Sequence, residues 1–253
     1  MTTGAEQAVT SGAQRAVTSG AQRAVTPDEG VLDDVVTASL LRDHRAFVRR
    51  RGRVVRYDPQ VAGFIGHPPD MTDDDWHHLR ELVPPDSEFT LRNLTLTGAP
   101  GAGIRVVSTH LAVQMTGEHL TTRDSPALST LGPSDVGEML DLVRLTRPGP
   151  FFERTIEMGT YLGIRIDRRL VAMAGERLRP PGWTEISAVC VHPEHRRRGL
   201  AATLVTAVGA HVRSQGRIPF LHAAAGNENA IRLYDHLGFR LRRNVSLTRL
   251  RTP

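Results

Sequence analysis

The chain has 253 residues, of which 40% are hydrophobic, enough for one large or two small buried cores. Its single cysteine, Cys190, excludes an internal disulfide, and no apolar run is long enough to cross a membrane. The N-terminus lacks the charged start and apolar segment of a secretory signal, so we expect a cytoplasmic protein without a membrane partner.

The charge composition is unusual because all 32 basic residues are arginine, balanced by 27 acidic residues to a net charge of +5. Together with abundant Ala, Gly, Pro and Val, this indicates the codon bias of a GC-rich bacterial genome, so the high pI requires no nucleic-acid partner. The arginine-rich segment 49–53 is a candidate phosphate-binding patch. Without interleaved aromatic residues, a solvated surface is the better interpretation, and we expect no nucleic-acid binding.

The chain begins with a short repeat. Residues 8–15 recur intact as residues 16–23, and a third copy starts at Ala24. A unit so small and polar cannot bury a hydrophobic face, and two and a half copies are too few for a solenoid. We therefore predict that residues 1–29 form a disordered tail.

Residues 30–123 are predicted to form a small N-terminal α/β domain of unknown role. Apolar residues recur at helical spacing over 31–47, and a second, short helix contains Trp76. Residues 89–97 and 104–115 alternate in the manner of strands. These patterns indicate a mixed α/β layer but no chemistry.

A second domain is predicted over residues 131–253, after a polar linker at 124–130 that contains Pro126. It starts with a capping box at Asp135 and Glu138. The expected order of elements is then two helices, three antiparallel strands, a helix, a strand, a helix and a final strand.

The most informative segment of this domain is Arg196-Arg197-Arg198-Gly199-Leu200-Ala201. It joins the apolar strand that ends at Val191 to the helix that begins near Ala202. A strand that turns through glycine into a helix directs several backbone N–H groups, and the positive end of the helix dipole, at one spot. The segment therefore predicts a phosphate-binding loop.

A second segment, residues 227–239, is an amphipathic helix that ends at Gly238. The two segments resemble the R/Q-x-x-G-x-G/A loop and the N-x-x-A-x-x-L-Y-x-x-x-G-F helix of the GNAT superfamily of acetyl-CoA-dependent N-acetyltransferases. They occur in the family's order, and the resemblance extends from Leu131 to about Leu250. It implies a mixed, mostly antiparallel sheet flanked by helices. By analogy alone, the N-terminal domain could be a degenerate copy of this fold.

The resemblance also implies an activity, which is direct transfer of an acetyl group from acetyl-CoA to a primary amine within a ternary complex. The backbone of loop 196–201 would bind the pyrophosphate, Gly199 would allow its close approach, and Arg197 and Arg198 would add charge.

The pantetheine arm would lie beside the strand that leads into this loop. Val189 and Val191 would offer it backbone groups in a cleft opened by a bulge, and Asn227 would bind the arm or close the cleft. The residues expected at the cofactor are Val189, Cys190, Val191, Arg196, Arg197, Arg198, Gly199, Leu200, Ala201 and Asn227.

Two residues are candidates for the chemical step. Glu185 stands where histone-acetylating relatives have a catalytic glutamate, and a raised pKa would suit it as a general base. A glutamate at a strand end can instead be solvated or paired with arginine. Tyr234 occupies the motif position of the acid that protonates the leaving thiolate, the alternative being a tyrosine packed beneath the helix.

Other chemistry is not expected. Cys190 lies on an apolar strand without a neighbouring base, so we interpret it as a core residue rather than a nucleophile. His192, His195, His211 and His222 have no companion ligands at suitable spacing, and we predict no metal.

The sequence defines the acceptor less well than the cofactor site. The acceptor groove is expected at residues 147–155 and 243–247. A small amine, an amino acid or a peptide N-terminus would fit it, in a monomer or a homodimer. A non-catalytic acyl-CoA sensor or partner-binding subunit is the alternative function. The presence of Glu185 and Tyr234 favours the enzyme.

Overall fold

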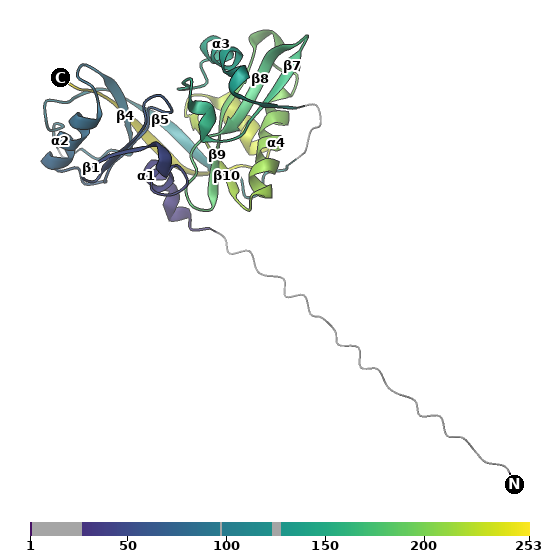
Figure 1. Ribbon diagram of the computed structural model, residues 1–253, viewed down its shortest axis with the longest axis horizontal. Helices are drawn as coiled ribbons and strands as arrows, with labels where there is room; N and C mark the ends of the chain where they lie inside the picture. The colour runs from purple at the N-terminus through teal and green to yellow at the C-terminus, as the bar shows by residue number, and fades with distance from the viewer. Residues whose placement is uncertain (2–26, 97, 123–127) are drawn as a thin grey trace.

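The computed structural model describes residues 1, 27–96, 98–122 and 128–253. The predicted tail lies outside the described residues except for its first residue and its last three. Most of the described chain surrounds one large sheet, which is mixed and mostly antiparallel, as the resemblance implies (Figure 1).

The large sheet has eight strands among the described residues, and the only parallel neighbours in it are β9 and β10. The order across the sheet is β4 (Glu88–Arg92), β11 (Arg240–Arg251), β5 (Arg105–Thr116), β10 (Ile218–Ala224), β9 (Trp183–Val191), β8 (Arg169–Glu176), β7 (Tyr161–Ile166) and β6 (Ser129–Leu131).

Helices cover both faces of this sheet because its strands are apolar on both sides. In β8, Ala172 and Ala174 pack in the same core as Leu204 of helix α4 (Leu200–Ser214). Met173, between them, packs on the opposite face against Met139 of helix α3 (Val136–Thr146). Helix α5 (Glu228–His236) adds Tyr234 to the α4 side.

The N-terminal half supplies a small three-stranded sheet and two helices of its own. Their bounds are α1 (Val35–Leu40), β1 (Val48–Arg51), β2 (Val54–Tyr57), β3 (Ile65–Gly66) and α2 (Asp73–Leu82). Short 3-10 turns complete the described elements at Glu29–Leu32, Arg45–Phe47, Pro133–Asp135, Thr155–Met158 and Pro193–His195. No helix in the described ranges is both long enough and apolar enough to cross a bilayer.

Strands from both sides of the predicted linker build the large sheet. β5 lies between β10 and β11, and its register with β11 extends from Arg105 to Thr116. β4 pairs with the outer edge of β11, and β6 includes Ser129 from the predicted linker. β4 and β5 of the N-terminal half therefore share one sheet with the strands of residues 131–253.

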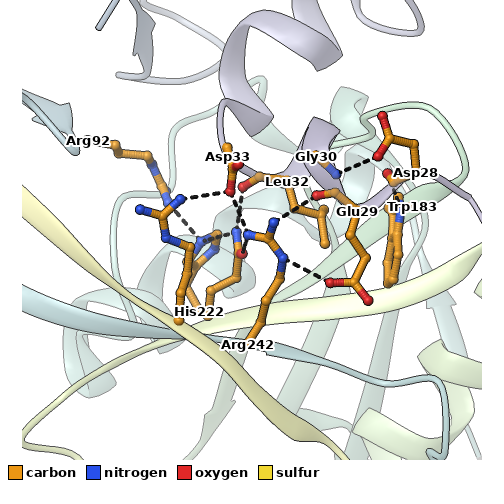
Figure 2. Close-up of polar contacts among 11 residues, drawn as sticks. Asp28, Glu29, Gly30, Leu32, Asp33, Arg92, Trp183, His222 and Arg242 are labelled. Carbon is orange, nitrogen blue, oxygen red and sulfur yellow. Dashed lines mark hydrogen bonds and ion pairs between the residues drawn. The ribbon is translucent and has the colours of Figure 1, made fainter.

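The start of the folded chain is fastened to the sheet by polar contacts (Figure 2). The indole Nε1 of Trp183 donates to the carbonyl of Asp28 at 3.3 Å. Arg242 donates to the carbonyl of Glu29 at 2.9 Å and forms ion pairs with the Glu29 and Asp33 carboxylates. Asp28 and Glu29, which the sequence places in the tail, thus contact the body of the protein.

These contacts predict different effects for two N-terminal truncations. Deleting residues 1–29 should lower Tm by about 2–6 °C relative to deleting residues 1–26, because it removes the contacts of Asp28 with Trp183 and of Glu29 with Arg242. Thermal unfolding of both variants beside the full chain measures the difference. Equal Tm values for the two truncations would show that these contacts do not stabilise the fold.

Candidate active site

The site is built where strands β9 and β10 separate. Their parallel register ends with the pair Phe220 and Glu185, although β9 continues to Val191 and β10 to Ala224. A cleft of about 560 Å³ lies between the separated ends. It is lined by residues 186–191 of β9, residues 222–224 of β10, and the starts of helices α4 and α5.

A β-bulge in β9, opposite β8, turns the end of β9 away from β10. Met173 of β8 is paired with Cys190 and Gly175 with Ser187, so three steps along β9 match two along β8. Ala188, within the bulge, has a φ of +51°. This arrangement confirms the bulge expected in this strand, and it leaves backbone groups of Val189 and Val191 beside the cleft.

The loop after β9 leads into a helix N-terminus that no side chain caps. Gly199, with a φ of +77°, is the N-cap of α4 and offers no side chain to cap the helix. The first N–H groups of an α-helix have no partner within the helix, so those of α4 remain available to a ligand. Arg196 lines the cleft, and its Nε donates to the carbonyl of Val191 at 3.3 Å.

The structure brings most of the expected cofactor residues to this cleft. Its lining includes Val189, Cys190, Val191, Arg196, Ala201 and Asn227. Arg197, Arg198 and Gly199 are exposed on the loop beside it, and Leu200 is the first residue of α4. Asn227 also caps α5, because its Oδ1 accepts a hydrogen bond from the Ala230 N–H at 3.2 Å.

Cys190 is a buried residue whose thiol is poorly suited to nucleophilic attack. It packs with Met139 and Met173 on the α3 side of the sheet. Burial raises the pKa of its thiol to about 11, so the thiol stays protonated at neutral pH. This environment agrees with the interpretation of Cys190 as a core residue.

Tyr234 reaches the cleft from helix α5. Its side chain is buried, lines the cleft and packs edge-on against Phe239, with the ring centroids 5.8 Å apart. Burial raises the pKa of the phenol to about 12. The phenol is therefore a proton donor rather than a phenolate at neutral pH.

Glu185 lies where β9 and β10 separate, which we call the branch point. Its side chain is fully buried in an ion pair. Arg177 contacts both carboxylate oxygens at 2.8 Å, and Nδ1 of His222 lies 2.7 Å from Oε1. Burial alone would raise the pKa of Glu185, but the charge and hydrogen bonds of Arg177 hold it well below its usual range. The expected raised pKa is wrong, and the arginine-paired alternative describes this residue.

His222 connects Glu185 with the N-terminal half, and Figure 2 shows it beside Arg92. Its Nε2 faces the Gln114 amide nitrogen at 3.1 Å and Nη1 of Arg92 at 3.3 Å. Arg242 donates to the Gln114 amide oxygen, which directs the amide nitrogen at His222. Nε2 therefore accepts and Nδ1–H donates to Glu185. Burial, then the nearby Arg92 charge, lowers the pKa of His222 to about 4, so the ring is neutral.

A second cavity, of about 470 Å³, adjoins the cleft. The two share Pro148, Arg177 and residues 222–224. Phe152 and Leu247, from the two segments expected to form the acceptor groove, also line this cavity. Its remaining walls come largely from β3, β4 and β5.

Sequence reasoning did not select Arg92, Arg177 or His222 as site residues. They come from β4, from the turn after β8 and from β10, and only the sheet order brings them together. Arginines are frequent throughout this chain, so no local signal distinguished these two.

One grouping of possible metal ligands lies outside the cleft lining. Ligand atoms of His192, Glu194 and His195 lie within 4.8 Å of one another in the turn after β9. Sequence spacing had suggested no companion ligand for these histidines, and the turn supplies Glu194. That the protein uses no metal remains a prediction.

Comparison with known proteins agrees with this architecture. Residues 161–247 match the family model described as FR47-like protein. A putative GNAT-family acetyltransferase from Novosphingobium aromaticivorans shares 38% sequence identity, with a TM-score of 0.80 over 88% of this chain and 98% of that one. A GCN5-related N-acetyltransferase from Kribbella flavida has the same fold at 17% identity, with a TM-score of 0.59 over 87% and 95% of the two chains.

The chain belongs to the GNAT family and is an acyltransferase. The search of curated proteins gives no match. Family membership favours the enzyme over the non-catalytic sensor that the sequence left open.

The ion pair at the branch point predicts a large effect of Glu185→Gln on stability. The variant leaves Arg177 buried without its counter-charge, so the free energy of unfolding should fall by about 3–5 kcal/mol. Urea denaturation at pH 7 measures it. The double variant Glu185→Leu/Arg177→Met, which removes both charges, should recover most of the loss. An unchanged stability in Glu185→Gln would contradict this account of the ion pair.

Proposed function

We propose that the enzyme transfers an acetyl group from acetyl-CoA to a primary amine, directly and within a ternary complex. The observation that carries this proposal is the cleft between β9 and β10, which ends at the free N-terminus of α4 and contains Tyr234. Acetyl-CoA is a long, anionic thioester, and it requires an anion site, a groove and a proton donor in that arrangement.

The chain's own groups fit acetyl-CoA along the whole cleft. The uncapped N–H groups at Gly199 to Ala201 would hold the pyrophosphate, with exposed Arg197 and Arg198 adding positive charge. Backbone groups of Val189 and Val191 would pair with the pantetheine arm as an added strand. Acetyl-CoA supplies the activated acetyl group.

The reaction exchanges one bond for another. The amine nitrogen attacks the thioester carbonyl carbon, the C–S bond breaks, and the amine loses one proton while the departing sulfur gains one. Tyr234 lines the cleft as a protonated phenol, so we assign to it the proton that the thiolate takes.

The amine proton is assigned to the Glu185 and His222 pair. Glu185 lines neither cavity, whereas His222 lines both. The predicted role of Glu185 as a base would therefore be exerted through His222. The ionised Glu185 fixes the Nδ1–H tautomer of His222 and would stabilise an imidazolium. Nε2 of His222 would take the proton once the Arg92 and Gln114 N–H donors that face it had withdrawn, and Glu185 would stabilise the resulting charge.

The anion site predicts that Gly199→Trp weakens acetyl-CoA binding by about tenfold or more, because a side chain there obstructs the loop and strains a residue with positive φ. Calorimetry with acetyl-CoA measures Kd. Gly216→Trp is the matched control, since Gly216 has a φ of +72° and similar open space but lies outside the cleft lining. Equal affinities of the two variants for acetyl-CoA would refute the proposal that loop 196–201 binds the pyrophosphate.

The acid role predicts that Tyr234→Phe lowers kcat by about 10²-fold while acetyl-CoA affinity changes little, because only the transition state gains from the proton. Free-thiol release with an amine panel measures kcat. Tyr161→Phe is the control, since that hydroxyl is buried without a partner and lies outside the cleft lining. Because the pKa of Tyr234 is about 12, wild-type kcat should not fall through phenol ionisation below pH 10. Wild-type turnover by Tyr234→Phe would exclude it as the acid.

A further inference from the structure

The cavity beside the cleft contains a cation that has no ion-pair partner among the residues that the structure describes. Arg92 of β4 lines this cavity, and no described carboxylate forms an ion pair with its guanidinium. Its hydrogen bond to a described residue runs from Nη1 to Nε2 of His222. The guanidinium is a planar fork of five N–H groups, and the others remain available to a ligand.

The remaining charges around this cavity are balanced. Arg177 is neutralised by Glu185, and Glu88 forms an ion pair with Arg249 at 3.5 Å. Glu185, and more weakly Asp34, attract Arg92 without forming an ion pair with it, and the Asp34 carboxylate caps α1. The cavity therefore has a net positive charge located on Arg92.

Arg92 is held in place by an aromatic ring. Its guanidinium carbon lies 5.3 Å from the centroid of the Phe64 ring, a cation–π contact that orients the fork. Burial lowers its pKa to about 10, so the group still carries its charge at neutral pH. A fixed, charged fork of this kind matches the geometry of a carboxylate.

The rest of the cavity wall is mainly apolar. Phe64, Phe89, Phe152, Leu111 and Leu247 line it. A cavity of about 470 Å³ is in the range of small-molecule sites. It accommodates an apolar side chain beside the group that Arg92 binds.

We propose that the acceptor is a free α-amino acid with an apolar side chain, and that Arg92 binds its carboxylate. His222 contacts Arg92 and also lines the cleft, so the bound carboxylate and the reacting amine are only a few bonds apart. An α-amino acid has this spacing. A peptide N-terminus lacks the carboxylate at that position. This inference rests on the proposed acetyl transfer.

The test compares matched acceptors that differ only in the carboxylate. With acetyl-CoA, kcat/KM for L-leucine and L-phenylalanine should exceed that for L-leucinamide and L-phenylalaninamide by about 10- to 100-fold. Arg92→Gln should remove this preference, because it should lower kcat/KM for the acids relative to that for the amides by the same factor, about 10- to 100-fold. Arg92→Lys, which keeps the charge, should retain part of it.

Arg240→Gln is the control for loss of an arginine, because Arg240 is exposed on β11 and lies outside both cavity linings. Its acid-to-amide ratio should equal that of the wild type. Calorimetric titration of L-leucine into the enzyme with saturating CoA supplies a readout without turnover, and Arg92→Gln should weaken that binding by the same factor. The Tm of each variant confirms folding.

Two results would overturn the inference. One is equal kcat/KM for acids and amides in the wild type, and the other is a parallel loss for both in Arg92→Gln. Failure of the proposed function looks different, because no amine would then release thiol from acetyl-CoA while L-leucine still bound in an Arg92-dependent manner. Absence of turnover together with absence of L-leucine binding would reject both.

Discussion

The separation of β9 from β10 beyond Glu185 is the constraint on which the rest of the site depends. Two parallel strands that stop pairing inside a sheet expose backbone groups and a buried edge, and both need partners. At the branch point the protein places a carboxylate held by Arg177 and His222. Beyond it, the bulge at Ala188 turns β9 away and opens the cleft. The ion pair thus occupies the point where strand pairing gives way to a binding groove.

The N-terminal half contributes to this site as part of the same sheet. β5 pairs with the edge of β10 that faces away from β9. It carries Gln114, whose amide fixes the tautomer of His222. β4 carries Arg92 to the second cavity. Arg242 then connects Gln114 with Glu29 at the start of the folded chain (Figure 2). The walls of the cleft thus come mainly from residues between 186 and 234, whereas much of the wall of the second cavity comes from described residues between 63 and 112.

Local signals in the sequence predicted local structure well. The turn at Gly199 and the helix capped by Asn227 depend on neighbouring residues, and both are where the sequence places them. In place of the second of the two helices expected before the strands, the structure has a 3-10 turn from Thr155 to Met158, in which the Thr155 hydroxyl donates to the distant carbonyl of Val61. The partners of Glu185 depend on strand order, which hydrophobic periodicity does not encode. The pKa expectation for Glu185 failed for that reason.

On the proposed binding mode, Arg92 would connect acceptor binding with the chemical step, because its charge faces the ring that is assigned the amine proton. Burial and this charge both hold the pKa of His222 near 4, which makes the free enzyme a poor base. On the proposed binding mode, the acceptor's carboxylate would offset the Arg92 charge and draw Nη1 away from Nε2. The same ligand that brings the amine would then raise the basicity of the group that deprotonates it. Acceptors without a carboxylate would lose this effect together with the binding contact, so the selectivity of the site would extend to kcat as well as KM.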